Sequence, residues 1–252
     1  MPHSTLSAWP DGPRRPLTAL GDPHQRRRAA RRLIDVLQAG GCPPDRVFDC
    51  LLPEPLRLVS PQYWSPLPVA KRAAEWFRDV RVQSVVDIGS GVGKFCVATA
   101  ILGECRLTGL EVRPFLVRSA RTLARLFELN ERVRFVSGAL GTVPTPQADA
   151  YYFFNPFGAY AFGADALTNG DGMFNAAQQA HSVTVAERLL RRVPIGTWVL
   201  TLNGFGGRMP EGYDVIRVDW TVPGALRLWR KTQSCTYLRR ARPARRVPSI
   251  AT

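Results

Sequence analysis

The sequence predicts an α/β fold, a doubly wound parallel sheet that follows an N-terminal helical appendage. Short apolar runs alternate with longer helical stretches from Gln83 onward, which is typical of a parallel sheet covered on both faces. A glycine-rich turn over 89–93 joins the first apolar run directly to a helical stretch. The chain has 252 residues, 45% of them hydrophobic, which is enough material for a buried core.

Seven strands are expected, each a short apolar run bounded by turn-forming or polar residues. Their ranges are 84–88, 106–110, 133–137, 150–154, 197–202, 215–219 and 226–230. Helices are expected between the earlier strands, at 94–102, 114–129 and 175–192. The sequence therefore predicts strands and helices in alternation over most of the domain.

The N-terminal part has a different organisation. Residues 1–23 contain five prolines and are expected to be disordered, and helices are expected at 24–38 and 44–52. Ser65 is a good helix N-cap before Pro66, so a further helix is expected over 66–79. We therefore divide the chain into a basic N-terminus (1–23), a helical appendage (24–62), the α/β domain (63–238) and a basic C-terminal tail (239–252).

Positive charge is concentrated at the two ends of the chain. The formal net charge is +14, but residues 1–32 carry seven arginines against two aspartates, and residues 227–252 carry eight basic residues and no acid. Such ends are compatible with phosphate contacts to a nucleic acid, although solvated tails are the simpler interpretation. The charge alone does not decide between these two interpretations.

Cysteine and histidine usage excludes several classes of site. Five cysteines without a CxxC pair and only three histidines indicate neither a disulfide framework nor a metal centre. No apolar run approaches the ~20 residues of a membrane-spanning helix, and the first thirty residues lack a secretory signal. We therefore expect a cytoplasmic protein that does not enter a membrane.

The turn Gly89-Ser90-Gly91-Val92-Gly93 allows three interpretations. A phosphate-binding P-loop requires four residues between its glycines and a hydroxyl after its lysine, whereas here there are three and Phe95 follows Lys94. A dinucleotide fingerprint would place its third glycine at position 94. A simple strand-to-helix turn explains one glycine well but three alternating glycines poorly.

The segment from about Tyr63 to Arg230 resembles the class I S-adenosylmethionine-dependent methyltransferases. The resemblance rests on Asp87-x-Gly89-x-Gly91-x-Gly93, on Glu111 and on Asn155-Pro156-Phe157. It implies a seven-stranded, mostly parallel sheet with one reversed strand near the C-terminal edge, and S-adenosyl-L-methionine as cofactor. The residues implied to bind the cofactor are Asp87, Gly89, Ser90, Gly91, Gly93 and Glu111.

Within this resemblance, each part of the site has an expected role. The glycines would let the backbone approach the cofactor, Asp87 would help to hold its ammonium group, and Glu111 would accept both ribose hydroxyls. Many members of the family carry an acid or amide after the third strand to bind adenine, where this chain has Ala139. We therefore expect backbone atoms or a neighbouring side chain to bind the adenine.

The motif Asn155-Pro156-Phe157 resembles the Asn/Asp-Pro-Pro-aromatic motif of amino-group methyltransferases, without its second proline. Carbonyl oxygens of Asn155 and Pro156 could hold the hydrogens of an amine while its lone pair attacks the methyl group, and Phe157 could cover the reacting centre. An Asn-Pro turn at the end of a strand is the alternative. Tyr63, Trp64 and Phe205 are candidate contacts to the substrate.

We expect the first of three functions, and the other two are alternatives. The first is methyl transfer to a nitrogen of a small molecule or a protein side chain. The second is methyl transfer to RNA or DNA, which the basic ends and the Asn-Pro-aromatic motif favour. The third is a noncatalytic protein that binds the cofactor and has lost the acceptor site.

Overall fold

The computed structural model describes residues 22–156 and 176–234. The expected basic ends, 1–23 and 239–252, lie outside these ranges apart from Asp22 and Pro23, which begin the first helix. Phe157 also lies outside them. None of the helices in the described ranges has the length and apolar character that a bilayer crossing requires.

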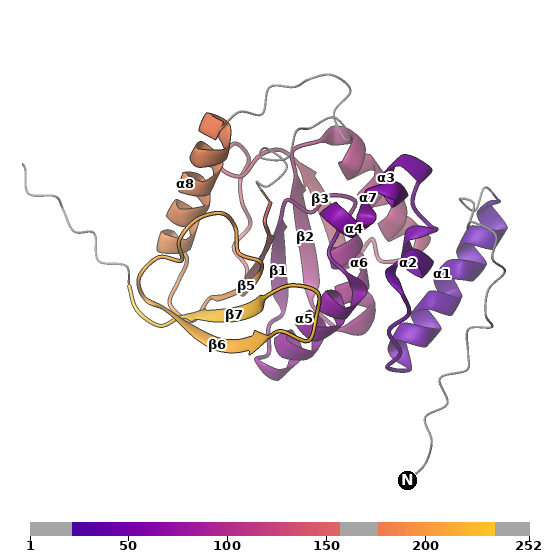
Figure 1. The fold of residues 1–252 in the computed structure, drawn as a ribbon, viewed down its shortest axis with the longest axis horizontal. Helices are drawn as coiled ribbons and strands as arrows, with labels where there is room; N and C mark the ends of the chain where they lie inside the picture. Colours follow the sequence, from indigo (N-terminus) through magenta and orange to yellow (C-terminus); the bar gives the residue numbers. More distant parts are fainter. Residues whose placement is uncertain (1–21, 157–175, 235–252) are drawn as a thin grey trace, which may run out of the picture.

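A seven-stranded sheet forms the centre of the fold, in the order β3-β2-β1-β4-β5-β7-β6 (Figure 1). β7 pairs antiparallel with both β5 and β6 and the other pairs are parallel, so the predicted sheet with one reversed strand near its edge is confirmed. The strands are β1 (Ser84–Ile88), β2 (Arg106–Glu111), β3 (Val133–Ser137), β4 (Ala150–Phe154), β5 (Trp198–Leu202), β6 (Tyr213–Asp219) and β7 (Leu226–Lys231).

Helices cover both faces of the sheet because its central strands are apolar on both sides. In β1, Val85 belongs to a core shared with α5 (Leu67–Asp79), α6 (Lys94–Leu102) and α7 (Pro114–Leu126). Val86 and Ile88 instead pack with α8 (Ala176–Arg192) on the opposite face. This alternation follows the two-residue period of a strand. Helix α7 ends three residues earlier than the sequence predicts.

The N-terminal helices pack on the first of these faces. They are α1 (Pro23–Gln38), α2 (Asp45–Asp49), α3 (Glu54–Leu58) and α4 (Ser60–Tyr63). Leu33 and Leu37 of α1 are buried in the same core as α6, and Phe48 of α2 stacks on Phe127 at 5.6 Å between ring centroids. The helix expected over 44–52 is therefore shorter, and two further short helices follow it where the prolines predicted a linker.

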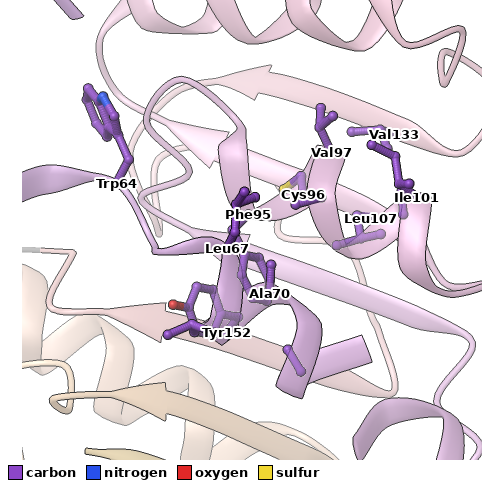
Figure 2. Close-up of a cluster of buried hydrophobic side chains, with 14 of the residues drawn as sticks. Trp64, Leu67, Ala70, Phe95, Cys96, Val97, Ile101, Leu107, Val133 and Tyr152 are labelled. Carbon is purple, nitrogen blue, oxygen red and sulfur yellow. The ribbon is translucent and has the colours of Figure 1, made fainter. Parts of the chain in front are cut away.

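The N-cap expected at Ser65 is wrong. Helix α5 begins at Leu67, and its first amide donates instead to Oδ1 of Asp45 in α2, at 2.9 Å. The hydroxyl of Ser65 shares a buried hydrogen bond with the phenol of Tyr152, at 2.8 Å. Tyr152 in turn stacks on Phe95 at 3.7 Å, and both rings lie in the buried cluster of Figure 2. A side chain distant in sequence therefore caps this helix.

Candidate functional site

The glycine turn joins β1 to α6 at the end of the sheet where the parallel strands terminate (Figure 1). Gly89, Gly91 and Gly93 have φ values of 79°, 55° and 78°, and Gly93 is the N-cap of α6. Residues that carry a side chain rarely adopt this left-handed region, so the backbone conformation favours glycine at all three positions.

Protein side chains lie close to all three glycines. A Cβ on Gly89 would lie 2.6 Å from Cβ of Pro156, and one on Gly91 would lie 2.5 Å from Cζ3 of Trp64. A Cβ on Gly93 would lie 2.4 Å from the Phe135 ring. The glycines therefore allow the turn to pack between β3, β4 and the segment before α5.

Glu111, at the end of β2, links this turn to the next loop. Its Oε2 accepts the backbone N–H of Gly91 at 3.0 Å, and its Oε1 accepts the N–H of Arg113 at 2.9 Å. The side chain is only 4% exposed, and burial raises the pKa of its carboxyl, while the two amides and the Arg113 charge act in the opposite direction. Each oxygen keeps a lone pair that could accept a hydrogen bond from a ligand hydroxyl.

Asp87 lies in β1 beneath the turn. Its carboxylate accepts a hydrogen bond from Sγ of Cys96 at 3.2 Å, and burial, with a smaller contribution from the nearby Glu111 charge, raises its pKa to about 7. Burial and the Asp87 charge raise the pKa of the Cys96 thiol well above its usual range. Cys96 therefore acts as a hydrogen-bond donor to Asp87 and not as a nucleophile.

A small cavity of about 60 Å³ brings together three of the residues that the sequence singled out. Gly89, Glu111 and Pro156 line it, along with Ala139 in the loop after β3. Arg113 and Ser182 also line it, although the sequence analysis did not select them. Arg113 could have been found from its position two residues after Glu111, whereas nothing local marks Ser182, which α8 brings from the other side of the sheet.

Asn155 and Pro156 follow β4, and Pro156 lines this cavity. Asn155 has a φ of 37°, and its backbone N–H donates to the carbonyl of Gly204 in the loop after β5, at 3.0 Å. Both residues are partly exposed. The motif therefore lies at the carboxyl edge of the sheet, next to the glycine turn, which is where open α/β sheets place ligands.

The other candidate residues lie outside the cavity lining. Phe205 is 2% exposed and packs against Phe153 in the core beneath α8. Trp64 is buried over Gly91 and its Nε1 donates to the carbonyl of Leu56 at 2.9 Å, with the Tyr63 ring 6.0 Å away. The hydroxyl of Ser90 is buried against Gly109 without a hydrogen-bond partner among the described residues.

No group of three or more histidine, cysteine, aspartate or glutamate side chains in the described ranges has a geometry suited to a metal ion. The four cysteines of these ranges, Cys42, Cys50, Cys96 and Cys105, are free thiols. Among the described residues, Glu111, Arg113 and Ser182 bring charged or polar groups to the cavity, and Asn155 precedes the lining residue Pro156.

No protein-family model matches the chain. It is 33% identical over 79 residues to the ribosomal protein L11 methyltransferase of Deinococcus radiodurans, a match that covers 31% of this chain and 28% of that protein. A crystal structure titled as a putative O-methyltransferase from Klebsiella pneumoniae has a TM-score of 0.52 and 16% identity, covering 84% of this chain and 99% of that chain. An RNA methyltransferase from Salinibacter ruber, in complex with S-adenosyl-L-homocysteine, has a TM-score of 0.49 and 19% identity, covering 69% and 96%.

The likeness to the Klebsiella pneumoniae structure concerns the fold, because the identity is only 16%. With the strand order β3-β2-β1-β4-β5-β7-β6, it shows that this chain has the fold of the class I methyltransferases. The Deinococcus radiodurans protein is similar over less than a third of either sequence.

Proposed function

We propose that this protein transfers a methyl group from S-adenosyl-L-methionine to a nitrogen atom. One observation supports the cofactor most directly: the buried carboxylate of Glu111, held by the amides of Gly91 and Arg113, lines a cavity between the glycine turn and β3. The methyltransferase fold and the short match to a methyltransferase agree with it.

The residues around the cavity offer groups that suit the nucleoside half of this cofactor, although the cavity, at about 60 Å³, has to widen before it can hold a nucleoside. The fixed carboxylate of Glu111 has the geometry to accept a vicinal pair of hydroxyls through its two oxygens. Val112 and Leu140 provide apolar walls suited to a flat base. Ala139 offers only backbone atoms, and its N–H is already shared with Oγ1 of Thr142 at 3.2 Å. Base contacts would therefore come from the walls and from the main chain.

The acceptor is assigned to Asn155 and Pro156. When bound, the cofactor supplies a methyl group on a sulfonium, which needs alignment of the attacking atom more than a strong acid or base. The amide oxygen of Asn155 and the carbonyl of Pro156 are acceptors for amine hydrogens at the edge of the sheet. The positive φ of Asn155 and its bond to Gly204 fix the backbone that carries them.

A titration with S-adenosyl-L-homocysteine tests the cofactor assignment, and a methyl-label assay over protein, RNA and small-molecule fractions tests the reaction. Micromolar binding together with label transfer to an amine is the expected result. Absence of binding would contradict the proposal as a whole. Binding without transfer to any fraction would favour the noncatalytic alternative, and transfer to RNA would favour the second candidate described next.

A nucleic acid is the second candidate for the acceptor, because of the surface of α1. Four exposed arginines, Arg27, Arg28, Arg31 and Arg32, lie within six residues of this helix, and none has an ion-pair partner among the described residues. The buried side chains of Ala30, Leu33 and Leu37 hold the helix against the domain. A fixed and unpaired cationic face of this kind suits a phosphate backbone.

A further inference from the structure

We propose that Lys94 is a positioning residue of the cofactor site, through which the N-terminal helices hold the glycine turn in its binding conformation. This inference rests on the proposed function, because it assigns to the segment 45–66 a part in cofactor binding. Lys94 follows Gly93 directly and is the first residue of α6. Its partners come from helices α2 and α4, more than thirty residues earlier in the chain.

The ammonium group of Lys94 is enclosed by three polar side chains and one ring. Its Nζ lies 2.6 Å from Oδ1 of Asp45 and 2.8 Å from Oδ1 of Asp49, with the hydroxyl of Ser60 at 3.4 Å. The ring of Phe48 lies 5.6 Å from it. Lys94 is 2% exposed, so protein groups replace almost all of the water around this cation.

The position of Lys94 makes these partners necessary. A cation at the first residue of a helix is disfavoured by the positive end of the helix dipole, and a buried cation is costly unless it is paired. Two carboxylates from α2 offset both effects. Burial raises the pKa of Asp49 and the Lys94 charge opposes that rise, so the ammonium group favours the ionised carboxylate.

One further contact joins the same segment to the same turn, and another joins the segment to α5. The Trp64 indole lies against Gly91, held in place by its hydrogen bond to the carbonyl of Leu56. Oδ1 of Asp45, which binds Lys94, also accepts the amide of Leu67 at the start of α5. The turn is therefore held at Gly91 and at Lys94 by one continuous segment, and Gly91 is also the amide that binds Glu111.

This arrangement has a consequence for binding. If α2 and α4 separate from α6, the turn loses both contacts, and the amide of Gly91 is no longer fixed relative to Glu111. Because an ordered site does not have to be ordered again by its ligand, the ion cluster should increase the affinity for the cofactor. Cofactor binding should reciprocally stabilise the N-terminal segment, since coupling between two sites acts equally in both directions.

The test compares a double variant with a matched control. A single Lys94→Met exchange leaves Asp49 as an unpaired buried carboxylate and can unfold the protein, so Lys94→Met is combined with Asp49→Asn, which removes both buried charges and keeps the side-chain volumes similar. Asp45 remains, but its side chain is 37% exposed and keeps the Leu67 amide as a partner. The control is Arg217→Gln, which breaks the exposed ion pair to Asp79 away from the turn. The Kd of S-adenosyl-L-homocysteine is measured by calorimetry and the Tm by thermal melting.

The double variant should melt within a few degrees of the wild type and bind S-adenosyl-L-homocysteine about tenfold more weakly, while the control binds normally. An unchanged Kd in the folded double variant would overturn the inference while leaving the proposed function intact. If the wild type does not bind at all, the proposed function itself fails.

If the double variant does not fold, hydrogen exchange of the wild-type protein tests the inference instead. Addition of S-adenosyl-L-homocysteine should slow the exchange of amides in α2 and α4, which do not line the cavity. Equal exchange in that segment with and without this ligand, at concentrations that saturate the site, would contradict the coupling.

Discussion

The carboxylate of Glu111 accepts the backbone amide of Gly91 at 3.0 Å and thereby joins the end of β2 to the glycine turn that follows β1. The two residues come from adjacent parallel strands, so their carboxyl ends meet at one edge of the sheet. The acid has two roles in the proposed site: it fixes the turn, and it offers its remaining lone pairs to a ligand.

Loss of this carboxylate should weaken cofactor binding. We expect Glu111→Ala to raise the Kd of S-adenosyl-L-homocysteine by ~100-fold, and Glu111→Gln by less, because the amide still accepts hydrogen bonds. Calorimetry measures both values, and Glu131→Gln, an exposed acid in the turn between α7 and β3, is the control. Equal affinity of Glu111→Ala and wild type would remove Glu111 from the site.

Substitution of Gly91 should lower the stability of the fold as well as the affinity of the site for a ligand. Gly91→Ala introduces a side chain at a φ of 55° and against the Trp64 ring, so we expect it to lower the free energy of unfolding by about 1–3 kcal/mol. Combining it with Trp64→Leu should give less than the sum of the two single effects, because the clash with the ring is gone. Additive effects in urea denaturation would show that the two residues are independent.

The side-chain amide of Asn155 should matter for turnover and have little effect on the affinity for the cofactor. Because its φ of 37° favours glycine, Asn155→Gly removes the side-chain amide without backbone strain, and Glu128→Gly, at an exposed residue with a φ of 57°, is the matched control. We expect kcat to fall by ~100-fold in Asn155→Gly, with an unchanged Kd for S-adenosyl-L-homocysteine. Full activity in the folded variant would reduce Asn155 to a turn former.

The buried carboxyl of Asp87 should make stability depend on pH. Its pKa is raised from 3.8 to about 7, so between these values the folded state binds more protons than the unfolded state. The stabilisation is therefore complete below about pH 4 and is lost as the pH rises through 7. Relative to Asp87→Asn, the wild type should lose at most about 4 kcal/mol across this interval. Parallel profiles of Tm against pH for the two proteins would contradict this prediction.

The cationic face of α1 provides the test of the nucleic-acid candidate. Exchange of Arg27, Arg28, Arg31 and Arg32 for Gln should weaken binding to a single-stranded RNA and reduce the slope of log K against log salt by up to about 3, since each lost phosphate contact contributes about 0.7. The control exchanges Arg188, Arg191 and Arg192 of α8, on the opposite face of the sheet. Equal slopes for both variants and the wild type would show that the α1 arginines do not contact the RNA.

Local patterns in the sequence were sufficient for most of the sheet. Each strand is a short apolar run with its own boundaries, so β1, β3 and β4 begin and end where the pattern predicts. The glycine turn and Glu111 were also readable, because three alternating glycines after a strand have few local explanations. These features depend on residues that are close together in the chain. The two-residue period of a strand and the 3.6-residue period of a helix are therefore visible in the sequence itself.

The pairs that complete the site could not be read in this way, because their partners are distant in sequence. The sequence suggested Trp64 and Phe205 as substrate contacts, whereas only packing decides that Trp64 lies on Gly91 and Phe205 lies beneath α8. In the sequence, Lys94 belongs only to a turn that does not match the phosphate-binding motif. In the structure, α2 places Asp45 and Asp49 against it. The sequence by itself determined the strands, the turn and the acid, and the tertiary structure decided which side chains hold them, since burial and ion pairing depend on three-dimensional proximity.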